Sequence, residues 1–273
     1  MAGAPKSGSS SLWQYLRQHP EVYLPDQKEL FYFDFNFEKG VEWYSEFFSG
    51  HQTEAAIGEA TVWYMRWSTV PERMSELLPN VKLIFVLRNP VDRAYSNWCH
   101  EKRDGIHPFD QTFEDFLKRE DRDSRTIISS GYYSEHLERF LRYFPRGQIH
   151  ICFTEDLKSA PKETCKDVFD FIGVNPEFEP DLSFEDNVSW WFGSFWILRV
   201  SKAILTPFKF IFGENPIDFM WRKSRHFRSL FWRRGERPPK CSEADRETLK
   251  QEYKPHIEAL ETLLKRSLSQ WKT

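Results

Sequence analysis

Met1-Ala-Gly-Ala-Pro-Lys-Ser-Gly-Ser-Ser-Ser-Leu12 begins the chain, and an amphipathic segment at Leu12–Gln18 continues it. Small residues followed by such a segment predict a strand, a loop and a helix. In this arrangement backbone N–H groups of the loop and of the helix start face an anion. Lys6 adds a positive charge, and the neighbouring small and hydroxyl residues, Ser7, Gly8, Ser9, Ser10 and Ser11, complete the candidate cradle. The stretch therefore predicts a phosphate-binding loop.

The loop differs from the Walker A motif, which requires Gly-x4-Gly-Lys followed by Ser or Thr. Here Ser9 follows Gly8, and the only lysine, Lys6, lies two residues before that glycine. A small-molecule kinase is therefore the weaker alternative, also because no convincing magnesium-binding aspartate follows a predicted strand. The segment Met1–Pro5 leaves room for a short first strand or for a start codon farther upstream.

A second motif runs from Leu87 to Trp98 and reads Leu-Arg-Asn-Pro-Val-Asp-Arg-Ala-Tyr-Ser-Asn-Trp. The apolar run Lys82–Arg88 predicts a buried parallel strand, and Pro90 is typical of the first turn of a helix. Arg88 would thus lie at the carboxyl end of a strand, where open α/β sheets bind ligands. Its guanidinium can hold a phosphate, and Ser96, two turns along the helix, can donate to the same group. Together with Lys6, this motif predicts a ligand with two phosphate-like groups.

Alternating strand and helix patterns predict the fold class. Gln148–Phe153 is a second strand candidate and Ala56–Ala60 a weaker third. Helical patterns occupy four ranges: Val70–Leu78, Tyr133–Phe144, Lys162–Ile172 and Ser242–Leu268. Such alternation indicates a three-layer α/β fold with a central parallel sheet flanked by helices. We find no repeat or linker, so we predict one domain over residues 1–273.

Composition narrows the partners and the location. A net charge of −3 and a pI near 6.3 give no indication of nucleic-acid binding. The four cysteines, Cys99, Cys152, Cys165 and Cys241, match no metal spacing, which favours buried free thiols, and no metal site is expected. No signal-peptide pattern precedes the loop, so we predict a cytoplasmic protein.

Trp190–Gly213 is rich in aromatic and aliphatic residues, interrupted by Arg199, Lys202, Pro207 and Lys209. These interruptions make it a poor transmembrane candidate. It can be a pair of core helices, a hydrophobic lid over an acceptor, or an interfacial helix with peripheral membrane contact. We predict that residues 190–235 form an acceptor or lid region; a non-catalytic, membrane-associated binding module is the further alternative.

The two anion motifs resemble those of sulfotransferases that use 3′-phosphoadenosine 5′-phosphosulfate (PAPS). Pro5–Leu12 is similar to their 5′-phosphosulfate loop, and Leu87–Ser96 to their 3′-phosphate motif, about 80 residues later in the same order. The resemblance extends to further segments up to about residue 175: His19–Val22, Lys28–Phe33, Gly58–Ala60, Gly131–Arg139, Glu155–Leu157 and Phe171–Val174. The nearest branch contains the heparan sulfate N- and 3-O-sulfotransferases and bacterial carbohydrate-type enzymes.

The resemblance implies a P-loop-like fold and a role for each matching residue. Lys6 would stabilise the leaving phosphate, Arg88 and Ser96 with Tyr133 would hold the 3′-phosphate, and Glu29 would be the general base. Glu59 and His136 are weaker catalytic candidates. Arg233–Pro238 echoes a C-terminal nucleotide loop and adds Arg234 and Gly235. Ala60 replaces a lysine of the heparan enzymes. The implied reaction needs no metal and moves a sulfuryl group to a hydroxyl or amine of a small-molecule, lipid or saccharide acceptor.

Overall fold

The computed structural model describes residues 1–119, 121–183, 190–192, 196–206, 216–224, 227, 232–234 and 240–272. The chain divides into two compact units. The first comprises Met1–Arg93, Tyr132–Asp186 and Tyr253–Thr273, and the second comprises Ala94–Gly131 and Asn187–Glu252. Both phosphate-site motifs begin in the first unit. The prediction of a single domain stays a prediction.

The first unit is built on a parallel sheet. Strand β3 (Leu83–Leu87) pairs in parallel with β4 (Ile149–Phe153), and β1 (Val22–Tyr23) pairs in parallel with β2 (Ala56–Ile57). The segment 1–4 joins these pairs, because it runs parallel to β3 through N–H···O bonds of 2.7 to 3.0 Å. On its other side, the Thr61 N–H donates to the Met1 carbonyl over 3.0 Å. The short segment before the loop is therefore the central strand.

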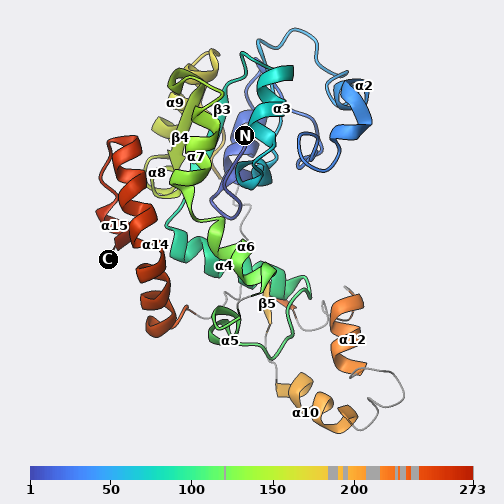
Figure 1. Cartoon of the computed structure of the whole chain (residues 1–273). Coiled ribbons are helices and arrows are strands. Elements are labelled where there is room, and N and C mark those ends of the chain that lie inside the picture. Colours follow the sequence, from blue (N-terminus) through green and yellow to red (C-terminus); the bar gives the residue numbers. More distant parts are fainter. Residues whose placement is uncertain are drawn as a thin grey trace. The chain divides into compact units, whose positions relative to one another are not determined.

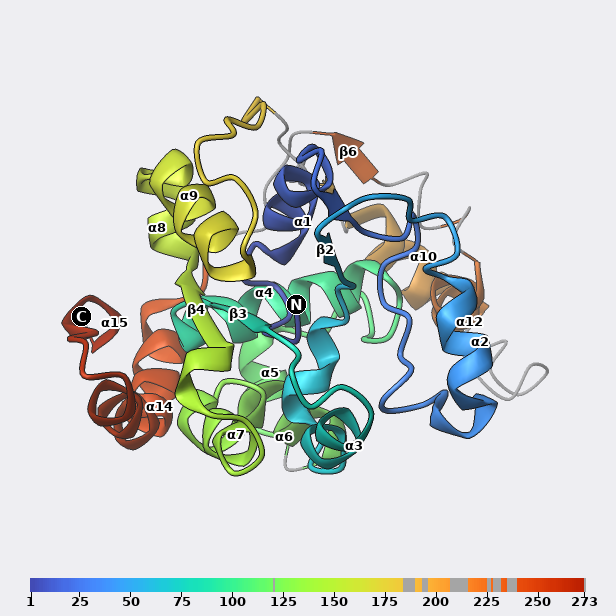
Figure 2. The same cartoon turned by 90° about the horizontal axis from the view of Figure 1, so that it is seen from above.

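Helices cover both faces of this sheet (Figures 1 and 2). On one face, α1 (Ser9–Arg17), α8 (Thr154–Ser159) and α9 (Pro161–Ile172) share a buried apolar cluster with the sheet. On the other face, α7 (Tyr133–Leu141) packs Phe140 against Phe85 of β3, with ring centroids 5.0 Å apart. Alternate residues of each buried strand point to opposite faces, so a continuous apolar run is needed. The predicted three-layer α/β fold is confirmed.

The strands and helices lie close to where the sequence predicts them. The apolar runs form β3 and β4, and a shorter β2 occupies the weaker candidate. Helices α3 (Val70–Leu77), α7 and α9 match their predicted ranges within a few residues. The range predicted as a single C-terminal helix is divided into α14 (Glu243–Leu264) and α15 (Ser269–Lys272). A further short helix, α2 (Gly40–Glu46), follows the segment that carries Glu29.

Two helices begin directly after the carboxyl ends of strands, and the residues at each junction favour a helix start. Gly8, at φ 93°, stands before α1, and this left-handed backbone favours glycine because a Cβ atom crowds the chain there. Pro90 starts α4 (Pro90–Arg103), and the side-chain oxygen of Asn89 accepts the Val91 N–H over 3.0 Å. The phosphate loop and Arg88 therefore follow two adjacent strands at the same edge of the sheet.

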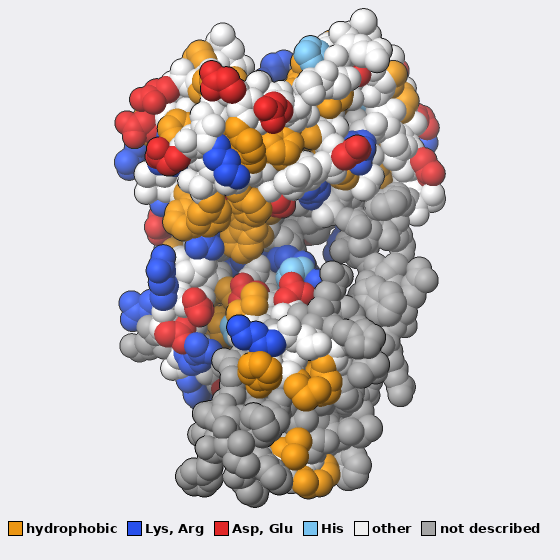
Figure 3. Space-filling view, turned by 90° about the vertical axis from the view of Figure 1, so that its right-hand side faces the viewer, with side chains coloured by type: hydrophobic (Ala, Val, Ile, Leu, Met, Phe, Trp, Pro, Cys, Tyr) orange, Lys and Arg blue, Asp and Glu red, His pale blue; other side chains and the backbone are white. Residues whose placement is uncertain are grey.

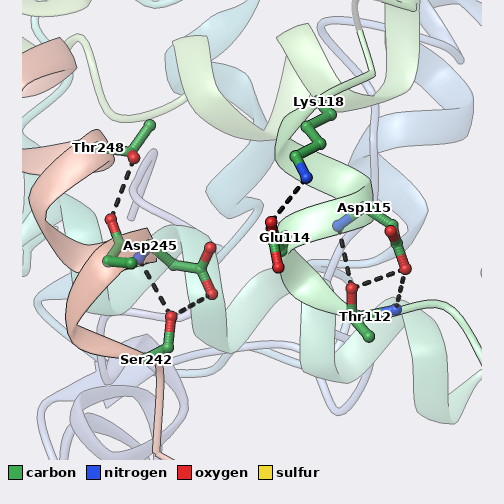
Figure 4. Close-up of polar contacts among 8 residues, drawn as sticks. Thr112, Glu114, Asp115, Lys118, Ser242, Asp245 and Thr248 are labelled. Atoms are coloured by element: carbon green, nitrogen blue, oxygen red, sulfur yellow. Dashed lines mark hydrogen bonds and ion pairs between the residues drawn. The ribbon is translucent and has the colours of Figure 1, made fainter.

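The second unit is mainly helical. Besides parts of α4 and α14, it contains α5 (Phe113–Leu117), α6 (Arg122–Ser129), α10 (Trp196–Leu205), α12 (Pro216–Lys223) and an antiparallel pair, β5 (Trp190–Phe192) with β6 (Trp232–Arg234). Figure 4 shows two of its helix starts, where Thr112 accepts the Asp115 N–H and Ser242 accepts the Asp245 N–H. Each of these bonds satisfies an N–H group that the helix leaves unpaired.

Candidate active site

The loop after the central strand has the backbone of an anion site. Lys6 adopts φ 64° and Gly8 φ 93°, so the chain turns sharply between them. The first helical hydrogen bond of α1 runs from the Leu12 N–H to the Gly8 carbonyl, over 3.3 Å. The N–H groups of the three serines before it have no partner within the helix, as at every helix start. Lys28 donates to the Ser10 hydroxyl over 3.2 Å, which brings a second cation to this loop.

Arg88 is tied directly to the loop. Its guanidinium donates to the Lys6 carbonyl over 3.0 Å, and the Tyr133 hydroxyl donates to the Arg88 carbonyl over 3.0 Å. Thr154 is buried at the carboxyl end of β4. Its hydroxyl lies within hydrogen-bonding distance of two carbonyls, that of Ser7 at 2.6 Å and that of Leu87 at 3.0 Å. The structure thus brings together Lys6, Arg88 and Tyr133, which are far apart in the sequence. Thr154 was not predicted; its place directly after a predicted strand could have marked the position, but its two carbonyl partners are set only by the fold.

Tyr133 is a neutral hydrogen-bond donor in this arrangement. Its side chain is buried on α7, and burial raises the pKa of the phenol to about 12, while the nearby charge of Arg93 acts in the opposite direction. Of the other predicted nucleotide-site residues, Ser96 lies half-buried on α4, within the second unit. The Arg234 side chain and Gly235 lie outside the described residues.

Glu29 is held in a strained backbone conformation. Its φ is 58°, and that of Phe31 is 53°, values that non-glycine residues rarely adopt. The Glu29 N–H donates to the Ala60 carbonyl over 2.9 Å, and its carboxylate accepts the Val62 N–H over 3.2 Å. Burial raises the pKa of Glu29 to about 7; the charge of Glu59 also raises it, while Lys28 and the Val62 N–H lower it. The carboxyl therefore changes protonation near neutral pH.

This raised pKa makes the stability of the protein depend on pH. Between the ordinary value of 4.5 and about 7, the folded state keeps a proton that the unfolded chain releases, so stability falls as pH rises. Glu29→Gln should therefore raise the melting temperature at pH 8 and leave it unchanged at pH 4. The gain is at most about 3.5 kcal/mol, because one pKa unit corresponds to about 1.4 kcal/mol.

Thermal unfolding at the two pH values checks this prediction. Glu54→Gln is the control, because the Gln52 N–H lowers the pKa of that exposed carboxyl. Its substitution should give no stabilisation at pH 8. An equal melting temperature for Glu29→Gln and the unmodified protein at pH 8 would contradict the raised pKa.

Glu59 lies close to Glu29 in a different environment. Its carboxyl accepts hydrogen bonds from three hydroxyl groups: Thr61 over 2.6 Å, Tyr64 over 2.9 Å and Tyr44 over 3.1 Å. Burial raises the pKa of Glu59, and the same hydroxyl donors oppose that rise. Both of its oxygens already have donors, so the carboxyl is occupied within the protein.

His136 also has close protein contacts. It is buried on α7, where its Nδ1 contacts the guanidinium of Arg139. Arg139 in turn donates to the carbonyls of Met65 and Arg66, over 3.4 and 3.1 Å. These bonds connect α7 to the 3₁₀ helix Val62–Arg66, whose first N–H holds the Glu29 carboxylate.

An open cavity of about 760 Å³ lies at the opposite edge of the sheet from the loop. Its wall includes the starting residues of three strands, Val22, Ala56 and Leu83. Glu59 and two of the tyrosines that donate to it, Tyr44 and Tyr64, also line it. The first unit also exposes Phe35, Val41 and Ile57, and Figure 3 shows hydrophobic side chains gathered on one face of the molecule. The cavity is therefore separate from the anion loop.

The described part of the chain shows neither a metal-type cluster of side chains nor a helix that could span a membrane. No group of three or more His, Cys, Asp or Glu side chains there is arranged to hold a metal ion. Among the same residues, no helix combines the length and the apolar character needed to cross a membrane. All four cysteines are buried and carry free thiols, as predicted.

Comparisons with known proteins agree with this geometry. The family model described as "Sulfotransferase domain" matches residues 1–189. The human bifunctional heparan sulfate N-deacetylase/N-sulfotransferase 2 is 30% identical over 209 residues, covering 70% of this chain and 24% of the relative. The mouse heparan sulfate glucosamine 3-O-sulfotransferase 3B1 is 34% identical over 175 residues, covering 63% of this chain and 45% of the relative. The chain thus spans about a quarter to a half of the length of these relatives.

The fold has a match along the whole chain. The crystal structure of a sulfotransferase from Alicyclobacillus acidocaldarius superimposes with a TM-score of 0.75 and 26% identity, covering 100% of this chain and 97% of that one. The family model covers the loop, Glu29, Arg88 and Tyr133. With its parallel sheet, its helix-flanked anion loop and this match, the chain belongs to the sulfotransferase family.

Proposed function

We propose that this protein transfers a sulfuryl group from PAPS to a hydroxyl or amine of a small-molecule, lipid or saccharide acceptor, with Glu29 as the general base. The observation that carries the proposal is the 3.0 Å hydrogen bond from Arg88 to the Lys6 carbonyl. It unites two anion-binding groups at one sheet edge, and a ligand with separate 5′ and 3′ phosphate groups requires two such groups.

The donor set of the site fits such a nucleotide. The start of α1 offers backbone N–H groups, while Lys6 and Arg88 are half-exposed cations and Tyr133 is a neutral donor. Lys6 and the helix start would hold the 5′-phosphosulfate, and Arg88 with Ser96 and Tyr133 would hold the 3′-phosphate. PAPS, when bound, supplies an activated sulfuryl group attached to a phosphate.

The chain's own residues supply the remaining chemistry. A base with a pKa near the working pH is the most effective, and Glu29, at about 7, meets this condition. Its carboxylate would accept the proton of the acceptor hydroxyl or amine as that atom attacks. Lys6 would place positive charge where the leaving phosphate becomes negative, the electrostatic contribution that is usually the largest in such reactions.

Several finer points are part of the same proposal. The relatives carry heparan sulfate in their names, so a saccharide is a reasonable member of the acceptor class. Residues 190–235 would form the acceptor or lid region, with peripheral membrane contact through 190–213 as an alternative. We propose a single-domain, cytoplasmic enzyme that uses no metal.

Ligand-dependent melting tests the nucleotide assignment. Adenosine 3′,5′-bisphosphate (PAP), the desulfated product, should raise the melting temperature, because it binds the folded state only; at 100 times its dissociation constant the gain is about 2.7 kcal/mol. ATP lacks the 3′-phosphate and should give a much smaller rise at the same concentration. Equal shifts for ATP with magnesium and for PAP would instead support a kinase.

A further inference from the structure

Two side-chain hydroxyls accept hydrogen bonds from the backbone that follows Glu29. The Phe31 N–H donates to the Thr61 hydroxyl over 3.4 Å. The N–H groups of Tyr32 and Phe33 both donate to the Tyr64 hydroxyl, over 2.8 and 3.3 Å. Thus three consecutive backbone donors after the predicted base depend on two oxygens for their hydrogen bonds.

Glu59 orients both of these oxygens. It accepts the proton of the Thr61 hydroxyl over 2.6 Å and that of the Tyr64 hydroxyl over 2.9 Å. A hydroxyl has one donor and two acceptor positions, so Tyr64, donating to Glu59, has both lone pairs left for the two N–H groups. Chained hydrogen bonds of this kind polarise and strengthen one another. The carboxyl therefore determines which way the hydroxyls face.

The strained backbone explains why such an anchor is needed. Glu29 and Phe31 both have positive φ values, a conformation that costs of order 1–3 kcal/mol at each non-glycine residue and persists only where surrounding contacts impose it. The buried side chains of Tyr32 and Phe33 lie directly after the strained position. Among the contacts of the described residues, the Thr61 and Tyr64 hydroxyls are the acceptors of these three N–H groups, so losing a hydroxyl would loosen the backbone that follows Glu29.

We propose that Glu59 is a positioning residue, which acts through the hydroxyls of Thr61 and Tyr64 to hold the segment Glu29–Phe33 in the conformation that presents the Glu29 carboxylate to the acceptor. The inference rests on the proposed function of Glu29. It assigns Glu59 a different task from proton transfer, since its oxygens are already bonded to three hydroxyls.

The Glu59 cluster contains its own matched pair of variants. Tyr64→Phe removes a hydroxyl that joins Glu59 to the backbone of the segment Glu29–Phe33. Tyr44→Phe removes a buried hydroxyl that donates to the same carboxyl. Among the contacts of the described residues, this hydroxyl accepts no N–H of the segment Glu29–Phe33. Tyr64→Phe should lower kcat about 10- to 100-fold, the range expected for a misplaced catalytic group. Tyr44→Phe should change it by less than about threefold.

Two readouts separate positioning from a general loss of structure. The PAP-induced rise in melting temperature should be the same in both variants, because both leave the phosphate-binding loop and Arg88 unaltered. In Tyr64→Phe, the acid limb of the kcat–pH profile should also move from about 7 toward 4.5, because burial is the largest cause of the raised pKa of Glu29 and a loosened segment admits water. The charges that face Glu29 are Lys28, Glu59 and the Met1 amino group, and neither variant removes them.

Glu59→Gln supplies the decisive comparison with proton transfer. Its amide oxygen can still accept from the tyrosine hydroxyls, so turnover should stay within about tenfold of the unmodified enzyme, far above Glu29→Gln. A Glu59→Gln enzyme as inactive as Glu29→Gln would overturn the proposal and make Glu59 the base. Equal turnover in Tyr64→Phe and Tyr44→Phe would also overturn it. Full activity of Glu29→Gln would instead overturn the proposed function.

Discussion

Glu29→Gln should abolish most sulfuryl transfer while leaving the fold and PAP binding intact. Glutamine keeps the shape of the side chain and can still accept the Val62 N–H, which in the unmodified protein lies 3.2 Å from the carboxylate. It cannot accept a proton from the acceptor. Loss of a positioned base typically lowers turnover by about 10²–10⁴-fold, so we expect a decrease of at least about a hundredfold.

Initial rates with radiolabelled PAPS and a panel of acceptors measure this loss, and calorimetry with PAP measures binding. Glu29→Asp is the control, because it keeps a carboxylate but withdraws it from the acceptor by one methylene group. It should retain more activity than Glu29→Gln. In the unmodified enzyme, activity should rise with pH through about 7 as Glu29 loses its proton, since that is its pKa in the folded state. A profile flat between pH 5 and 8 would argue against a Glu29 base.

Arg88→Ala should weaken PAP binding strongly. The substitution removes a cation from the predicted 3′-phosphate position and also the 3.0 Å bond that fixes the Lys6 carbonyl. A lost charge-assisted hydrogen bond costs about 1.5–3 kcal/mol, which corresponds to one to two decades in affinity. Lys6→Ala should weaken PAP binding by a similar amount and should lower turnover in addition.

Arg17→Ala is the matched control for charge, because Arg17 lies in the last turn of α1 and pairs with Asp26 at the surface. Its PAP affinity should stay within about twofold, a change of about 0.4 kcal/mol. Arg88→Lys tests geometry, since lysine keeps the charge but lacks the planar fork of donors. Calorimetric titration with PAP gives all four affinities. If Arg88→Ala and Lys6→Ala both bound PAP as tightly as Arg17→Ala, the nucleotide site would have been assigned to the wrong residues.

The layers of the fold could be predicted from the sequence because their signals are local. The apolar run that forms β3, the proline that begins α4 and the small residues around Gly8 each act on their nearest neighbours. Periodicity within α7 likewise identifies its buried face, which carries Phe140 against β3. The small residues before the loop likewise indicated the strand segment that pairs with β3.

The candidate site was only partly accessible in this way. Lys6, Arg88 and Tyr133 were named from their motifs, and the structure brings them into one set of hydrogen bonds. Thr154 was not named, because its importance depends on carbonyls 67 and 147 residues away in the sequence. No pattern within a short window encodes a hydrogen bond between residues so far apart.

The sequence by itself determined the fold class and the two anion motifs, and its resemblance to sulfotransferases implied the pair of acidic candidates, Glu29 and Glu59. Only the tertiary structure decided how those two carboxyls differ. Burial raises the pKa of Glu29 to about 7, and its carboxylate accepts a backbone N–H, whereas hydroxyls of Tyr44, Thr61 and Tyr64 converge on Glu59. The physical reason is that solvation and hydrogen bonding depend on which groups surround a carboxyl in space, and folding brings those groups together from separate parts of the chain.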